Sequence, residues 1–505
     1  MTESKNKRLQ EEISPNEPTP KYYKLDFSNL ARLVVQDLNA NSGGNILFSN
    51  FSKEQAIRAL ENPQRNEREL RNLSNFLYIV SPHYKRLCDY HAEMLLLDWY
   101  ISPLRLDVDK VNEKQFIKAY RNTLNMLDNM NIKHEFSKVL KTVFREGIFY
   151  GYEYKTDDSF FLQKLDPEFC RITSVVDGVY NFEFNFQYFD ADESRLENYA
   201  PEFTTKYNLY KNSRQNRGAN GKRENLQWQE LDHENTVCIK TDEDISYPFP
   251  PFIGVLPDIY EIQDYKALKK ANNEMQNIAI FSGKIPYNDK SGIANDFKLT
   301  LDTAMEFGNK IITELPDQVG FMLSVFEDME LFKLSDDKVG TDKVEEAVNN
   351  FWSATGVSKN LFTDSGNTDA AMRYSITTDE QTVLQILRQI ERWINKKLKG
   401  ESGKYKFKIN MLDTTRYNQT LKITEELKAA QFGTPNKTKL FTTMGGSQSE
   451  MEGMAFLENQ ILQLHDNWIP LKSSHTSSES PTGGESKRPS KEEDETRIDD
   501  GGDSE

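Results

Sequence analysis

The amino-acid sequence predicts an α+β fold that is mostly helical, with an antiparallel sheet between two helical regions. Apolar residues recur every three or four positions over much of residues 25–144, as on one face of a helix. Residues 148–240 instead hold short aromatic and β-branched runs separated by turn residues. Helical spacing returns at residue 258 and continues, with short interruptions, to about residue 465. This order is typical of helices and strands that are segregated along one chain.

Size, charge and cysteine usage limit the class of protein. The 505 residues are 37% hydrophobic and 11% aromatic, which is enough to order several packed regions. We expect no membrane contact and a protein that stays inside the cell, because no run approaches about 20 apolar residues and the first residues lack a signal-peptide core. The net charge of −16 argues against a broad basic surface for nucleic acid, although not against brief contact with DNA. The widely spaced cysteines form no CxxC pair, so we expect them in the core: Cys88, Cys170 and Cys238.

The first helical region follows a polar, proline-containing arm over residues 1–24. Ser52 and Gln55 have the spacing of a capping box, which predicts that a helix begins at "KEQAIRAL". The dense apolar stretch "NFLYIVSPHYKRLCDYHAEMLLLDWYISPL" predicts further helix.

The sheet region is predicted from alternation and turn residues. The runs "GIFYGYEY", "SFFLQKLD", "FCRITSV" and "VYNFEFNFQYF" have the composition of strands. Strict alternation predicts one buried strand face with Phe182, Phe184, Phe186 and Tyr188. The loop "KNSRQNRGANGKREN" follows, and "LQWQELD" and "TVCIKTD" are expected to be further strands.

The second helical region begins with a long helix over 258–283, whose apolar spacing runs to Phe281, about 24 residues or roughly 36 Å. A small α/β insert over 284–334 contains a predicted helix, "NDFKLTLDTAMEF", and a predicted strand, "VGFMLSVF". A second helix over 335–355, a polar loop over 356–372 and a long helix over 373–399 complete the region. The long helix has a narrow apolar seam at Val383, Leu387, Ile390 and Ile394.

Residues 400–465 are expected to form the strand "YKFKINML" and several helices. Gly433 is a predicted helix terminator, with Thr434 as N-cap and Pro435 as first residue of the next helix. Ser447 and Glu450 have capping-box spacing. Residues 466–505 are almost devoid of apolar side chains, which predicts a disordered tail.

Motifs for catalysis are missing, and we expect neither an enzyme nor a bound cofactor or metal. "GANGKRE" and "FSGKIPY" lack the spacing of a P-loop, and no HExxH or GxSxG motif occurs. In "FDADESR", Arg195 stands where a calcium loop needs glycine, so a solvated turn is favoured over a metal site. His83, Cys88 and His91 have no second Cys or His pair nearby, which favours core packing over a zinc or nucleophile role.

Two further groups leave alternatives open. Phe351 and Trp352 could stack on bases, but their helical spacing favours packing between helices. A basic loop is either a soluble hairpin tip or a contact for phosphate or an acidic partner: Arg214, Arg217, Lys222 and Arg223.

The succession of α/β body, long helix, small insert, second helix, polar loop, long helix and C-terminal helices resembles the portal proteins of tailed bacteriophages. The segment "SATGVSKNLFTDSGNTDAAMRYSITTDEQTVLQILRQIERWINKKLKG" is similar to the family's Gly-Val element, polar loop and following helix. "GIFYGYEY" followed by "LDPEFCRI", and "PFIGVLPDIYEIQDYKAL", extend the resemblance over residues 25–465. The family often has prolines after Gly-Val, where this chain has "SKN".

This resemblance implies a portal-like, ring-forming homo-oligomer of twelve subunits at the capsid vertex of a virion, assembled in the host cytoplasm. Double-stranded DNA would pass through the channel during packaging and ejection. The implied partners are the terminase large subunit, the major capsid and scaffold proteins and a head-tail adaptor. The implied regions are a wing (25–257), two stem helices (258–283 and 335–355), a clip (284–334), a long wing helix (373–399) and a crown within 400–465.

The resemblance also implies that the loop over 356–372 meets DNA in the channel. Gly356 and Gly366 would act as hinges, and Lys359 would meet phosphates together with the backbone amides of Ser358, Asn360 and Asn367. Leu361 and Phe362 would anchor the loop to neighbours. Lys338 and Lys343 would add rings of positive charge, unless they pair along the helix with Asp342, Glu345 or Glu346.

Two other functions remain as alternatives to a portal. One is a metal-dependent nucleic-acid-processing enzyme with an unrecognised carboxylate site. The other is a helical scaffold or adaptor that never contacts DNA.

Overall fold

The computed structural model describes residues 53–156, 159–215, 226–245, 247–276, 279–284, 298–300, 302–303, 306–307, 310, 319–324, 339–357, 361–362 and 369–464. The chain forms two compact units, Met1–Met451 and Glu452–Glu505. The predicted N-terminal arm and polar tail lie outside the described residues. The described part is mostly helical with several small sheets, which confirms the α+β class. Within these ranges, every helix is too short or too polar to span a bilayer.

The first helical region contains more interruptions than the sequence predicts. Ser81 accepts a hydrogen bond from the Tyr84 amide (3.4 Å) and Pro82 follows, so a new helix begins inside the predicted continuous stretch. The end of that stretch is the strand β1 (Trp99–Leu104), not helix. Ser52 lies outside the described residues. The helices of this region are α2 (Lys53–Glu61), α3 (Glu67–Val80), α4 (Pro82–Ala92), α5 (Glu113–Asn129) and α6 (Ile132–Glu146).

Strand β1 is a correction that follows from long-range pairing. It pairs antiparallel with β10 (Lys406–Met411), with Trp99 opposite Met411 and Ile101 opposite Ile409. Each of these apolar side chains is buried. A strand whose partner lies so far along the chain leaves little local signal in the sequence.

The predicted antiparallel strands are confirmed and form two sheets. In one sheet β2 (Ile148–Lys155) lies between β3 (Phe160–Leu165) and β7 (Thr236–Lys240). In the other, β5 (Val179–Asn185) lies between β4 (Cys170–Val176) and β6 (Trp228–Glu230). Asp177 and Gly178 connect β4 to β5 with positive φ angles of 55° and 74°, as a tight hairpin requires.

The predicted strand face beyond Asn185 is wrong. The Asn185 side chain accepts a hydrogen bond from the Gln187 amide (3.0 Å), and the chain enters a 3-10 helix, η4 (Phe186–Asp190). Phe186 is still fully buried, but from this helix rather than from a strand. Further 3-10 helices in the described ranges are η2 (Val108–Lys110), η3 (Pro167–Phe169), η5 (Glu193–Asn198) and η6 (Ile253–Val255).

The predicted basic loop begins later than expected, because "KNSRQ" is the end of helix α7 (Pro201–Gln215). Phe203, Tyr207 and Tyr210 recur at helical spacing and are buried against the aromatic cluster of β5 and η4. Helix α7 therefore continues through the polar residues that follow Tyr210. Residues 216–225 lie outside the described residues.

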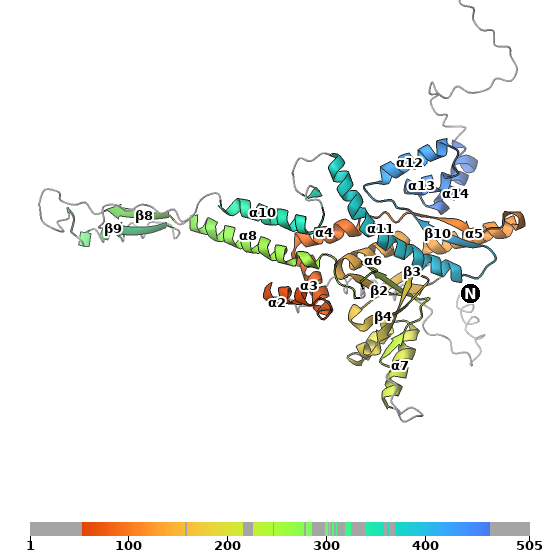
Figure 1. Cartoon of the computed structure of the whole chain (residues 1–505), viewed down its shortest axis with the longest axis horizontal. Coiled ribbons are helices and arrows are strands. Elements are labelled where there is room, and N and C mark those ends of the chain that lie inside the picture. Colours follow the sequence, from red (N-terminus) through yellow and green to blue (C-terminus); the bar gives the residue numbers. More distant parts are fainter. Residues whose placement is uncertain are drawn as a thin grey trace, which may run out of the picture. The chain divides into compact units, whose positions relative to one another are not determined.

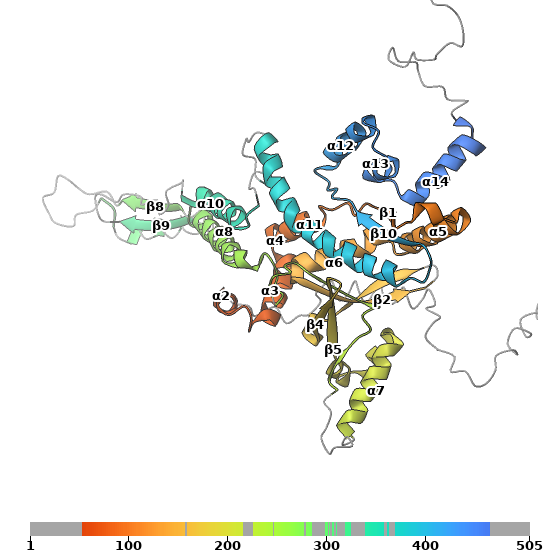
Figure 2. The same cartoon turned by 45° about the vertical axis from the view of Figure 1, so that its right-hand side comes forward.

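The two predicted stem helices are present with altered bounds. Helix α8 (Leu256–Gln276) ends before residue 283, and Ala279–Lys284 is the strand β8, which pairs in parallel with β9 (Val319–Ser324). Helix α10 (Val339–Ala354) runs beside α8 (Figures 1 and 2). Helix α11 (Asp369–Gly400) begins at residue 369 rather than 373, which shortens the predicted loop. Of the predicted insert helix, positions 302–303 and 306–307 are helical, whereas positions 298–300 are not.

The apolar seam of α11 packs into a core cluster, as its spacing predicts. Val383, Leu387, Ile390 and Ile394 are all 0% exposed. The Trp393 Nε1 group donates to the Thr236 carbonyl (2.8 Å). Gln389 accepts from the Lys240 amide (3.0 Å) and donates to its carbonyl (2.8 Å), which fixes α11 against β7.

The C-terminal helices are α12 (Gln419–Gln431), α13 (Lys437–Thr443) and α14 (Gln448–Phe456), followed by a π-helical turn (Leu457–Ile461). Gly433 ends α12 with φ 81°, as predicted. The predicted cap at Thr434 and Pro435 is wrong: Asn436 precedes α13, and its side chain instead donates to the Glu426 carbonyl (2.7 Å). Ser447 and Glu450 form the predicted capping box, each amide donating to the other's side chain (2.9 and 3.2 Å).

A buried ion group joins α6 to β3. The Glu146 carboxylate lies 3.0 Å from Arg145 Nη2 and 2.6 Å from Lys164 Nζ, with all three side chains less than a tenth exposed. Burial raises the pKa of Glu146, but the charges of Lys164 and Arg145 outweigh it and hold the pKa below its usual value. The carboxylate is therefore ionised in the folded protein.

Replacing Glu146 by glutamine is expected to lower the free energy of unfolding at neutral pH by about 3 kcal/mol, because two buried cations would lose their carboxylate. The contribution of Glu146 is present above the pKa of the unfolded chain and is lost as the pH falls through the lower folded-state pKa. Urea denaturation at several pH values measures both effects. In the control Glu93→Gln, which breaks a half-exposed pair with Lys141, the change should stay within about 1 kcal/mol. Equal effects of the two substitutions would contradict this assignment.

Candidate functional site

The candidate site is the loop between α10 and α11 together with the helices that hold it. At their inner ends, α8 and α10 pack in one core cluster with α2, α3 and α4. Phe351 and Trp352 are 0% and 2% exposed, which confirms the prediction that they pack between helices. The ring of His83 lies against both, with centroids 5.8 and 6.2 Å away. The loop therefore begins at a tightly packed part of the molecule.

The chain leaves α10 through a defined turn. Thr355 Oγ1 donates to the Trp352 carbonyl (2.7 Å) and accepts from the Val357 amide (3.2 Å). Gly356 between them has φ 75°, in the left-handed region that favours glycine. The turn directs Val357 back into the core, where it is 4% exposed. A hinge role for Gly356 stays a prediction.

Leu361 and Phe362 form what we call the loop anchor, which packs against the core cluster of its own chain. The Phe362 ring stacks on Trp352, with centroids 4.0 Å apart and planes 12° from parallel. Tyr90 on α4 meets the same ring edge-on at 5.5 Å. The predicted anchoring residues therefore bind the loop to α4 and α10 of the same molecule.

The far end of the loop is fixed by α11. The Tyr90 hydroxyl donates to the buried carboxylate of Asp379 on α11 (3.0 Å). Tyr90 thus contacts both the loop anchor and the helix that follows the loop. One side chain on α4 thus contacts the chain both before and after residues 363–368.

Most of the predicted DNA contacts lie outside the described residues: Ser358, Lys359, Asn360, Asn367 and Lys338. The predicted hinge Gly366 also lies outside them. Lys343 is exposed on α10. Contact of these residues with DNA stays a prediction.

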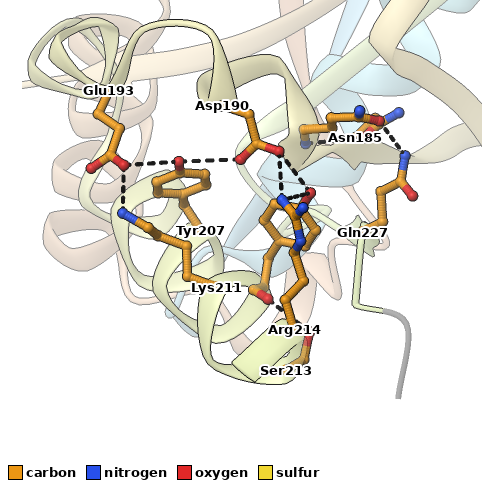
Figure 3. A network of polar contacts seen from close by, with 10 residues as sticks. Asn185, Asp190, Glu193, Tyr207, Lys211, Ser213, Arg214 and Gln227 are labelled. Atoms are coloured by element: carbon orange, nitrogen blue, oxygen red, sulfur yellow. Dashed lines mark hydrogen bonds and ion pairs between the residues drawn. The ribbon is translucent and has the colours of Figure 1, made fainter. Parts of the chain in front are cut away.

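Two carboxylates of "FDADESR", Asp190 and Glu193, bind side chains of α7 (Figure 3), whereas Asp192 accepts a hydrogen bond from the Ser194 amide (3.0 Å) in an exposed turn. Asp190 accepts from the Tyr210 hydroxyl and from Arg214 Nη1, both at 2.9 Å. Glu193 accepts from the Tyr207 hydroxyl (3.3 Å) and pairs with Lys211. Arg214 is thus paired with a carboxylate of its own chain. The other basic residues of the predicted loop lie outside the described residues: Arg217, Lys222 and Arg223.

The histidine and cysteine residues near position 88 have packing roles. Burial lowers the pKa of His91 to about 4, so its ring is neutral, and Nδ1 donates to the Leu87 carbonyl (3.0 Å). Burial raises the pKa of the Cys88 thiol. All three cysteines are buried and free, as predicted. Among the described residues, no group of three or more His, Cys, Asp or Glu side chains is arranged to hold a metal ion.

Comparisons with known proteins identify no family for this chain. No family model matches it, and no curated protein matches it.

Several solved structures are similar to it at low identity. A chain titled "Virion of native gene transfer agent (GTA) particle" is 12% identical, with a TM-score of 0.37 over 82% of this chain and 98% of that chain. A chain of the "Neck of empty GTA particle computed with C6 symmetry" is 13% identical, with a TM-score of 0.39 over 74% and 93%. A chain of the "Neck of native GTA particle computed with C12 symmetry" is 13% identical, with a TM-score of 0.34 over 81% and 98%. All three TM-scores are low, so neither the fold nor the function of this chain is inferred from them.

Replacing Phe362 by alanine is expected to increase protease cleavage between residues 356 and 369 about tenfold, because the lost ring contacts hold the loop to α4 and α10. Limited proteolysis with mass spectrometry of the fragments measures the rate. Tyr374→Ala removes an aromatic ring that is 75% exposed on α11 and should leave the rate unchanged. If both variants are cleaved like the unmodified protein, Phe362 does not anchor the loop.

Proposed function

We propose that this chain is a portal protein, a structural conduit for double-stranded DNA at one vertex of a viral capsid. The observation that carries the proposal is the order and packing of α8, the β8–β9 sheet, α10, the anchored loop and α11. A helix pair rooted in the body, with a small parallel sheet inserted between its helices, matches the parts that the resemblance implies. In this proposal α8 and α10 are the stem, β8 and β9 belong to the clip, and β10 with α12 to α14 forms the crown.

The burial pattern of α8 supports a role for identical copies. Ile259 and Ile262 are buried within the chain, whereas Leu268, two turns further along, is 45% exposed. In the proposed ring, a neighbouring copy would cover this side chain. In a ring, each helix pair would meet the helix pair of the next copy.

The charge of the chain suits DNA transport. Twelve copies with a net charge of −16 each would carry a charge of about −190. DNA that passes an acidic wall is repelled from all sides and meets no deep binding minimum. Local contacts from the loop, through Lys359 and the amides around it, would then guide the duplex without holding it.

The proposal assigns no active site to this chain. The energy for packaging would come from the ATPase of a separate terminase large subunit. The other proposed partners are the major capsid and scaffold proteins during assembly and the head-tail adaptor afterwards. Such a protein would be found at the capsid vertex of the virion and, during assembly, in the host cytoplasm.

Deleting residues 364–368 is expected to leave particle assembly intact and to reduce the yield of DNA-filled particles several-fold. The deletion ends before α11 begins at Asp369 and leaves the loop anchor in place, so the packed core keeps its contacts. Particle density in a gradient and DNA content measure the outcome. A deletion of the same length over 216–220, outside the proposed channel segment, is the control. A normal yield of full particles from the 364–368 deletion would contradict the proposed role of the loop.

A further inference from the structure

A basic and aromatic surface lies beside the loop anchor and has no role in the function proposed so far. Arg86 on α4 has its guanidinium carbon 4.9 Å from the centroid of the Phe362 ring. The Phe362 ring contacts Tyr90, whose ring lies 5.9 Å from that of Tyr417. Arg416 is the neighbour of Tyr417 in the segment between β10 and α12. Arg86, Arg416 and Tyr417 are all exposed, so the fold brings two arginines from distant parts of the sequence to one open surface.

The charges of both guanidinium groups act on the Tyr417 hydroxyl. Burial raises the pKa of Tyr417, while the positive charges of Arg416 and Arg86 act in the opposite direction. Both charges are therefore close to the same hydroxyl group. Arg416 Nε also donates to the Glu93 carbonyl (2.8 Å), which orients its guanidinium and leaves its terminal NH2 groups available.

The carboxylates around this surface already have partners. Asp89 accepts from the Tyr78 hydroxyl (2.6 Å) and lies 4.0 Å from Lys85 Nζ. Glu93 pairs with Lys141 (2.8 Å), and Asp379 accepts from Tyr90. Within the part of the chain that the structure describes, no ion pair joins Arg86 or Arg416 to a carboxylate. Both exposed guanidinium groups are therefore available to an anion from outside the chain.

We propose that Arg86 and Arg416 form a phosphate-binding site for the backbone of duplex DNA, with Tyr417 as an additional hydrogen-bond donor. Guanidinium groups bind phosphate through paired N–H donors, and two groups held in place lose little freedom on binding. The surface adjoins the anchor of the loop that the proposed function directs toward DNA, so this inference rests on that function. Phosphate contacts of this kind carry no base specificity and position the duplex.

The test uses the full-length protein and the double variant Arg86→Gln/Arg416→Gln. Fluorescence anisotropy measures binding of two short fluorescent duplexes of different sequence over a range of salt concentrations. We expect the variant to bind both duplexes about tenfold more weakly at low salt and to show a shallower dependence of affinity on salt. The control Arg58→Gln/Arg105→Gln removes the same charge from two other exposed arginines and should change the affinity less than about twofold.

Negative-stain imaging of the same samples separates this inference from the proposed function. If the unmodified protein forms rings and the double variant binds DNA like the control, the phosphate site is wrong while the portal proposal stands. If the double variant no longer forms rings, the arginines pair with carboxylates of a second copy, which also overturns the phosphate site. If the unmodified protein forms no rings, the proposed function itself fails.

Discussion

The burial of one face of α11 determines the position of most other elements. Its apolar seam packs with α6, β1, β10 and β7, and Gln389 satisfies both backbone groups of Lys240 on β7. A buried amide without these partners would cost about 1 to 3 kcal/mol, so sliding α11 by one turn is strongly disfavoured. Because α11 cannot slide, the point at which the loop enters it is fixed relative to the sheets.

Tyr90 connects the fixed helix α11 to the loop. This residue joins α4 to Asp379 on α11 and to the ring of Phe362, which stacks on Trp352 at the end of α10. The described residues before and after positions 363–368 are thus held by the packed body. If copies of the chain form a ring, this arrangement repeats the loop at equal positions around the axis.

Local patterns in the sequence predicted the elements whose partners are near in the chain. Aromatic and β-branched runs between turn residues identified β2 to β5, the 4, 3, 4 spacing identified the seam of α11, and Ser447 with Glu450 formed the expected cap. Strand β1 was missed because its partner β10 lies far along the sequence, and β8 was read as helix because its apolar run continues the pattern of α8. For the site, the packing of Phe351 and Trp352 followed from spacing, and the loop anchor followed from the family resemblance. The arginines Arg86 and Arg416 are brought to one surface by tertiary packing alone.

Imaging of the purified full-length protein by negative-stain electron microscopy tests the central claim, that identical chains close into a ring around DNA, most directly. We expect rings with a central hole of roughly 25 to 40 Å, wide enough for duplex DNA. A protein that is a monomer at high concentration would contradict the portal proposal and favour a scaffold or adaptor. Metal-dependent cleavage of DNA by such a monomer would favour the enzyme instead.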